Sequence, residues 1–247
     1  MGFRNLFRKE MKSLFPLFAV YGIAVTAAQV IVKFKSGGWG TDAPLVISLL
    51  MPLLFAAVLT IGAGYFQLST EWRTNTIYLL LSLPIRGWKV LTAKLVALMV
   101  LLVGTLLWVS GSFSLILLRS MWKTLFSDQV FGEIPLTMLN VAGNSLWMCL
   151  LTIVLFVMLA QFAFLCGQLV TRFRWLVALA AFFAGLWLIF RAAPLLSMLL
   201  AWLPDIRFGG ELDDVIYLHS GMFVALVLLA AGLMWLNGYL FEKVVEV

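Results

Sequence analysis

Six long apolar runs constrain this chain more than any other feature of its sequence. They cover residues 14–32, 45–66, 95–118, 145–170, 175–190 and 218–241. A helix needs roughly 20 mostly apolar residues to cross a bilayer, so each run is close to the required length, with the fifth the shortest. Only 11% of the residues are charged, against about 25% in a soluble domain. Most of the surface of this chain is therefore expected to face lipid.

These runs are expected to be helices. In lipid the backbone polar groups must be satisfied within the segment or by closing a barrel, and a barrel strand needs only about ten alternating residues. The runs here are longer and continuous. We therefore predict an all-α integral membrane protein with six transmembrane helices, in which residues 1–247 form a single transmembrane domain.

The basic residues predict the orientation, because they remain preferentially on the cytoplasmic side of a membrane. With the N-terminus inside, most of the 17 Lys and Arg residues fall on the cytoplasmic side. Both termini are then cytoplasmic. The net charge of +6 follows largely from this asymmetry, so no nucleic-acid partner is predicted.

Residues 1–13 predict an amphipathic helix at the membrane interface. Arg4, Arg8 and Lys12 recur every four residues, between apolar residues at spacings of three and four. Such a helix can lie in the headgroup region. It can serve as a positive-inside anchor or as an elbow that steers the first span, and the two roles are compatible.

The cytoplasmic loop at residues 67–94 is the most distinctive polar segment. From Glu71 onward, polar residues recur at steps of three and four, which predicts a short amphipathic helix that Pro84 ends. Arg86 then begins a basic turn, and Lys94 is expected to extend back to the interface, as long cationic side chains do. Such a helix can anchor the loop to lipid or present its polar stripe to a protein, and the spacing alone favours anchoring.

Residues 191–217 predict a re-entrant region on the outer side. Helical rise places Arg191 near the outer interface, and Pro194 is expected to break the helix. The apolar piece that follows, 195–203, is too short to span. A re-entrant helix between spans five and six is favoured, and the alternative is one kinked helix that runs to Leu203.

Several kinds of function lack support. The sequence has no phosphate-binding G-x-x-x-x-G-K-[ST] loop, so this chain is not expected to bind ATP in that way. An ion-coupled carrier usually has acidic residues in its spans, whereas the predicted spans of this chain contain no Asp or Glu. His219 lies near Asp213 and Asp214 in the sequence, which could indicate a metal site. A solvated outer loop is the favoured interpretation, so no metal is predicted. Thr152, Gln161 and Gln168 are expected to join helices through hydrogen bonds.

The loop resembles the cytoplasmic loop of the ABC-2 permease family, as do the basic amphipathic start and the six spans. The resemblance depends on Glu71, Arg73, Thr76, Leu79, Leu80, Pro84, Arg86 and Lys94. One departure is Asn75, where that family often has Gly.

The resemblance implies a transmembrane subunit of an ABC transporter in a bacterial plasma membrane. Its loop would be a coupling helix, with docking residues Glu71, Arg73, Thr76, Tyr78, Pro84 and Arg86. The partners would be a cytoplasmic P-loop ATPase and a second permease, either a copy or a paralogue. ATP and Mg²⁺ would be bound by the ATPase, so neither a cofactor nor an enzymatic activity is expected in this chain. Arg4, Arg8, Lys12, Lys94 and Arg191 are the expected membrane-interface residues.

Three functions therefore remain open. The first is export of a hydrophobic or amphipathic substrate, such as a peptide, a lipid-linked molecule or a drug, which the family and the apolar spans favour. The second is a scaffold or assembly factor that docks an ATPase without transport. The third is a membrane-embedded lipid-modifying enzyme, for which only Glu71, Arg73 and the outer acidic residues could supply polar groups.

Overall fold

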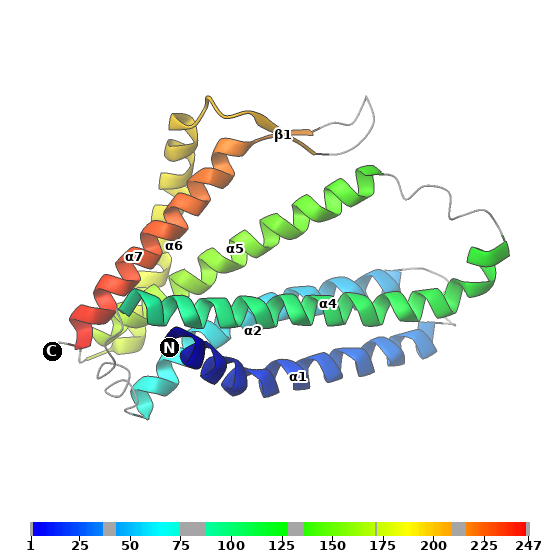
Figure 1. Cartoon of the computed structure of the whole chain (residues 1–247), viewed down its shortest axis with the longest axis horizontal. Helices are drawn as coiled ribbons and strands as arrows, with labels where there is room; N and C mark the ends of the chain where they lie inside the picture. The colour runs from blue at the N-terminus through cyan, green and yellow to red at the C-terminus, as the bar shows by residue number, and fades with distance from the viewer. Residues whose placement is uncertain are drawn as a thin grey trace.

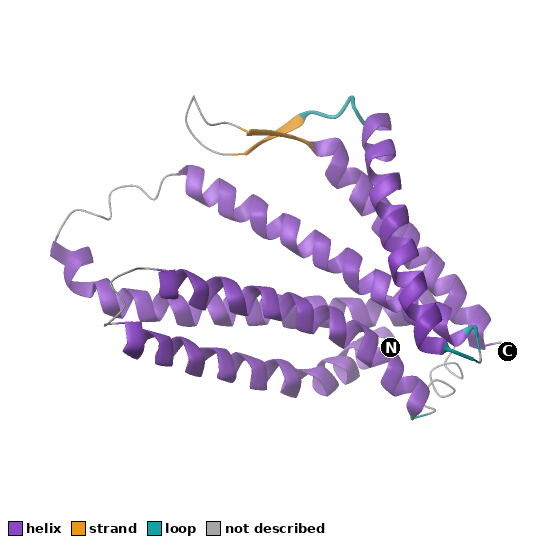
Figure 2. Cartoon of the chain, turned by 180° about the vertical axis from the view of Figure 1, so that it is seen from behind, coloured by secondary structure: helices purple, strands orange, loops and turns teal. Residues whose placement is uncertain are grey.

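The computed structural model describes residues 2–36, 43–74, 87–127, 136–170, 172–208 and 216–245. These residues form helices α1 (Gly2–Ser36), α2 (Ala43–Arg73), α4 (Gly87–Ser127), α5 (Leu136–Gln168), α6 (Arg174–Leu199) and α7 (Ser220–Val245). A two-stranded hairpin, β1 (Asp205–Phe208) and β2 (Ile216–His219), lies between α6 and α7 (Figure 2).

The prediction of six membrane-spanning helices is confirmed by length and composition. The spanning parts of the described helices are Phe3–Lys35, Ile47–Arg73, Gly87–Leu115, Gly143–Gln168, Arg174–Leu199 and Ser220–Lys243. Four of the six are longer than the runs predicted from the sequence, and the fourth and sixth have the predicted length but are shifted by two residues. The chain is therefore a multi-pass membrane protein whose helices extend beyond their most apolar residues.

The helices converge at one end of the molecule and spread apart toward the other (Figure 1). The converging end, called the base here, contains both chain termini, the end of α2, the start of α4, the α5–α6 turn and the end of α7. From the base, α1, α2 and α4 run together in one direction, while α6 and α7 run together in another. Helix α5 lies between the two groups and contacts α2, α6 and α7.

Burial is concentrated in α4 and α5. In an apolar segment of 18 residues within each of these two helices, 56% and 61% of the residues are buried, against 6% in the corresponding segment of α6. Small residues allow the close approach, as is common between membrane helices. Ala56, Ala63 and Ala97 are almost fully buried, and a Cβ on Gly64 would lie 2.9 Å from Cγ1 of Val157. The core is thus formed mainly by α4 and α5, packed with α1 and α2.

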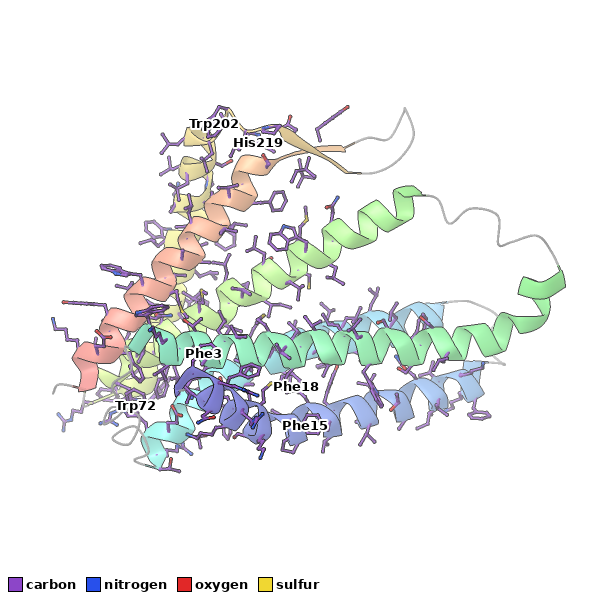
Figure 3. All side chains as sticks on the ribbon, in the orientation of Figure 1. Phe3, Phe15, Phe18, Trp72, Trp202 and His219 are labelled. Atoms are coloured by element: carbon purple, nitrogen blue, oxygen red, sulfur yellow. The ribbon has the colours of Figure 1, made fainter. Side chains whose placement is uncertain are left out.

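The predicted boundary between an interfacial helix and the first span is not present in the structure. Helix α1 is continuous from Gly2 to Ser36 and has Pro16 inside it, and its first turns bend relative to the rest (Figure 1). A proline inside a helix removes one hydrogen bond and is a common cause of such a bend. Phe15 is exposed on α1 whereas Phe18 is buried against the bundle (Figure 3).

The predicted helix break at Pro194 is wrong. Helix α6 runs through Pro194 to Leu199 and ends in overlapping turns at residues 200–203, because neighbouring groups in membrane helices can accommodate a proline. The described residues after this point form strand β1 rather than a re-entrant helix. Strands β1 and β2 are antiparallel, with Asp205 opposite His219.

Candidate functional site

A group of charged and polar side chains, most of them buried, lies at the base, where α1, α2 and α4 meet. We name the charge cluster by its five members: Lys9 and Glu10 of α1, Gln67 and Glu71 of α2, and Lys94 of α4. The side chain of Lys94 is fully buried, and those of Glu10 and Glu71 are only 5% and 8% exposed. Ionisable residues inside a membrane bundle are expensive to bury, so they are functional-site candidates.

Lys94 is the centre of the charge cluster. Its Nζ lies 2.9 Å from Oε1 of Glu10 and 2.8 Å from Oε1 of Glu71. Gln67 donates a hydrogen bond of 3.2 Å from Nε2 to the second carboxylate oxygen of Glu10. At the surface, Lys9 approaches Glu71 at 3.6 Å. Two lysines thus balance two glutamates, and a single ammonium group joins three helices.

Regular helix spacing brings these charges together. Glu10 follows Leu6 and precedes Leu14 and Phe18 at steps of four residues, and all four side chains are buried. Glu71 likewise follows Gln67 by four residues, and both are buried. Lys94 lies among the buried residues Val90, Leu91 and Leu98. Residues four apart share a face of a helix. Each charge therefore lies on the stripe with which its helix packs against the others.

The two ends of the central loop meet beside the charge cluster. Glu71 is in the last turn of α2, and Lys94 is in the second turn of α4, so their ion pair connects the helices on either side of residues 75–86. The first amide of α4, that of Gly87, donates a 2.8 Å hydrogen bond to Glu242 of α7. The negative charge of this carboxylate also interacts favourably with the positive N-terminal end of the α4 helix dipole.

Aromatic and glycine contacts reinforce this junction. Trp72 packs edge-on against Phe164 of α5 and Phe241 of α7, with ring centroids 5.4 and 5.9 Å apart, and it lies at the base (Figure 3). A Cβ on Gly238 would lie 2.7 Å from Cβ of Trp88 and 3.1 Å from its Cα. Helix α7 therefore contacts the chain both before and after the loop.

The charge cluster borders a cavity of about 290 Å³ between α1 and α2. Lys9, Glu10, Gln67 and Glu71 line it together with Ser13, Thr70, Thr74 and apolar side chains. Polar groups from outside the bundle therefore have a route toward the buried carboxylates. No group of three or more metal-binding side chains occurs in the part of the chain that the structure describes.

The structure changes the interpretation of two predicted site residues. Lys94 does not extend to the interface, because it is fully buried and paired with Glu10 and Glu71. Glu71 belongs to α2 rather than to a separate loop helix, and its carboxylate points into the bundle. The expectation that the spans lack acidic residues is also wrong, since Glu10 and Glu71 lie within the helices that can span the membrane.

The other predicted site residues are separate from the charge cluster or outside the described residues. Arg73 is exposed at the end of α2. Arg4, Arg8 and Lys12 are exposed on α1, and Arg191 is exposed on α6, 5.8 Å from the ring centre of Trp187. Thr76, Tyr78, Pro84 and Arg86 lie in residues 75–86, outside the described part of the chain, and their docking role stays a prediction.

The polar residues expected to join helices behave differently from one another. Gln161 is fully buried on α5, but neither atom of its amide has a hydrogen-bond partner among the described residues. Thr152 donates to the carbonyl of Met148 in its own helix, and Gln168 lines a cavity. Asn237 of α7, which the sequence analysis did not single out, joins α7 to α5 through the carbonyl of Met158 at 2.9 Å.

His219 lies at the end of the molecule opposite the base (Figure 3). Its Nδ1 is 2.9 Å from Oδ1 of Asp205 across the hairpin. Asp213 and Asp214, which prompted the question of a metal site, lie outside the described residues. In the described part of the hairpin, His219 therefore has a structural contact with the opposite strand.

No family model matches the chain, and no curated protein matches it significantly.

Proposed function

We propose that this chain is the transmembrane permease subunit of an ATP-driven ABC exporter, with residues 71–89 as the docking surface for a separate cytoplasmic ATPase. The observation that carries the proposal is the Lys94–Glu71 ion pair of 2.8 Å, which connects the helices on both sides of the loop. Lys94 also pairs with Glu10, so a displacement of the loop would move α1, α2 and α4 together.

Force transmission requires such a junction. An external motor can drive a membrane helix bundle only if the surface it moves is joined firmly to the helices that must move. A loop attached at two flexible ends would absorb the displacement. Here the ends are fixed by the charge cluster, by the Gly87–Glu242 hydrogen bond and by the packing of Trp72. The resemblance of the loop to that of ABC-2 permeases supports the same assignment.

In this proposal the base is the cytoplasmic end, in a bacterial plasma membrane, with both termini inside. A second permease, identical or paralogous, would complete the transporter. Helix α6 has the least buried spanning segment among those described, so it offers the most apolar surface to lipid or to that second subunit. The cargo would be hydrophobic or amphipathic, a peptide, a lipid-linked molecule or a drug.

The test is mild detergent purification from the native membrane, followed by identification of the proteins that remain bound. A stoichiometric P-loop ATPase is expected. Glu71→Gln removes one ion pair of Lys94 and is expected to change ATP turnover by more than about twofold, with the ATPase still bound. Arg191→Gln, which removes a charge from exposed α6, is the matched control and is expected to leave turnover unchanged.

Two outcomes would contradict the proposal. Recovery of the chain without an ATPase, under conditions that preserve other membrane complexes, would favour a lipid-modifying enzyme. An ATPase that binds stoichiometrically but turns over equally with wild-type chain and with the Glu71→Gln variant would favour the scaffold, because docking without force transmission does not require the ion pair.

A further inference from the structure

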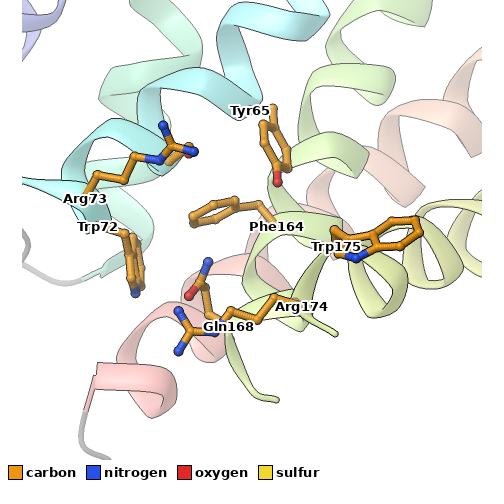
Figure 4. Close-up of a pocket in the computed structure, with 10 residues that line it drawn as sticks. Tyr65, Trp72, Arg73, Phe164, Gln168, Arg174 and Trp175 are labelled. Atoms are coloured by element: carbon orange, nitrogen blue, oxygen red, sulfur yellow. The ribbon is translucent and has the colours of Figure 1, made fainter. Parts of the chain in front are cut away.

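A second cavity at the base lies between α2, α5 and α6, and the charge cluster has no member in it. Its volume is about 400 Å³. Its polar lining residues are Ser69 and Arg73 of α2, Gln168 of α5 and Arg174 of α6 (Figure 4). In this view Arg73 and Arg174 lie on either side of Phe164 and Gln168. We call this cavity the arginine pocket.

The arginine pocket has positive charge that the described residues do not balance. None of its lining residues is acidic, and no described carboxylate lies within 4.0 Å of the guanidinium of Arg73 or Arg174. This contrasts with the charge cluster, where every lysine faces a glutamate. A guanidinium presents two parallel N–H donors and therefore suits the oxygens of a phosphate group.

The turn between α5 and α6 fixes the position of one arginine. Phe173, just before α6, has a left-handed backbone conformation with φ of 57°, and no side chain caps the helix. A Cβ on Gly167 would lie 2.8 Å from the carbonyl oxygen of Arg174, so only glycine allows the two helices to approach this closely. The uncapped start of α6 adds partial positive charge at the same place.

The rest of the arginine pocket is aromatic and extends into the membrane-spanning part of the bundle. Tyr65 precedes Arg73 by eight residues on α2, which corresponds to about 12 Å of helix. Tyr65 packs edge-on against Phe164, with ring centroids 5.2 Å apart. Trp175, which is 66% exposed, lines the cavity beside Arg174. The pocket thus combines cationic groups at the base with an apolar wall that continues away from them.

We propose that the arginine pocket binds the phosphate group of an anionic phospholipid, with acyl chains along the wall formed by Tyr65, Phe164 and Trp175. Free phosphate has the same chemistry for the arginines, but it gains nothing from the aromatic wall. Basic pockets between membrane helices bind lipid headgroups in this way. The site does not depend on the proposed transport function, since it requires neither an ATPase nor a cargo.

The test is native mass spectrometry of the delipidated full chain, titrated with phosphatidylglycerol, phosphatidylcholine or inorganic phosphate. Tighter binding of phosphatidylglycerol than of phosphatidylcholine is expected, with no competition from millimolar inorganic phosphate. Arg174→Gln and Arg73→Gln are each expected to weaken phosphatidylglycerol binding roughly tenfold or more, because each removes a charged hydrogen-bond donor. Arg174→Lys, which keeps the charge, is expected to retain part of the affinity.

The matched control is Arg191→Gln, which removes the same charge from an exposed position on the same helix and is expected to leave binding unchanged. Equal loss in the Arg174→Gln and Arg191→Gln variants would overturn the site, because it would indicate attraction by net charge alone. Displacement of the lipid by inorganic phosphate would overturn the lipid assignment. Circular dichroism of each variant verifies that a loss of binding is not a loss of fold.

Discussion

At the base, α1, α2 and α4 are joined by the ion pairs of Lys94 with Glu10 and Glu71. In the far half, which we define as residues 20–36 of α1, 43–58 of α2 and 101–115 of α4, the contacts between the same three helices include neutral hydrogen bonds between described residues. Tyr21 donates to the carbonyl of Pro52. Gln29 donates to the carbonyl of Val109 and accepts a hydrogen bond of 2.7 Å from Ser112.

The ion pairs at the base and the hydrogen bonds of the far half differ in the free energy that is lost when each is broken. Separating a buried ion pair leaves a charge in a low-dielectric interior, which is strongly unfavourable. Breaking a neutral hydrogen bond between membrane helices costs about 0.6 kcal/mol on average. We infer that the base moves as a unit, whereas the far halves can separate at a much smaller cost. An exporter driven from the base would need strong contacts at the base and weaker contacts between the far halves of its helices.

The largest expected effect comes from Lys94→Met, which leaves Glu10 and Glu71 buried without their common partner. Removing one member of a buried ion pair costs about 3–5 kcal/mol. A lower free energy of unfolding in mixed micelles, of this size, is therefore expected, measured by denaturant titration of the purified chain. Stability within about 1 kcal/mol of wild type would contradict the burial of Lys94.

A second variant separates stability from coupling at the same place. The triple variant Glu10→Gln, Glu71→Gln and Lys94→Met removes all three buried charges of the charge cluster. No buried charge is then left without a partner of opposite sign. Replacing a whole buried ion pair by neutral residues is often neutral or stabilising. The triple variant is therefore expected to recover most of the stability lost in Lys94→Met, and the same denaturant titration measures it.

An intermediate effect is expected at the close contact between α4 and α7. In Gly238→Ala the new Cβ would lie 2.7 Å from Cβ of Trp88 and 3.1 Å from its Cα, so the two helices must separate. Overpacking of this kind typically costs about 1–3 kcal/mol. The midpoint of thermal unfolding of the variant is expected to fall accordingly.

Gly232→Ala on the same helix is the matched control, because no described residue lies within 4 Å of a Cβ at that position. Its higher helix propensity is expected to keep stability equal or raise it slightly. If the two alanine variants unfold at the same temperature, the close approach of α7 to Trp88 at the base is wrong.

The sequence predicted the six helices well, because apolar length is a local property that each run carries by itself. It did not predict the charge cluster, because Lys94 and Glu10 are 84 residues apart and their meeting depends on how the helices pack. One signal was available. Glu10 lies on the same four-residue step as Leu6, Leu14 and Phe18, so an acidic residue interrupts an apolar stripe and must find a partner there.

Two further outcomes show the same limit. Pro194 was expected to end a helix, but α6 continues through it, because the neighbouring groups that accommodate a proline are not visible in a local pattern. The arginine pocket combines Arg73 and Arg174, which lie on helices separated by α4 and α5 in the chain. Exposed arginines at span ends look alike in sequence, and only packing identifies the two that share a cavity.

The smallest expected effect is in the far half. Gln29→Leu removes the hydrogen bonds to Val109 and Ser112, and in membrane helices such bonds contribute about 0.6 kcal/mol, reaching about 1.7. The free energy of unfolding is therefore expected to fall by much less than in Lys94→Met. Hydrogen exchange is expected to increase in the outer turns of α1 and α4 while the base stays protected, since local opening draws on the weakest contacts. Equal exchange at both ends of these helices would contradict the proposed division between a rigid base and a separable far half.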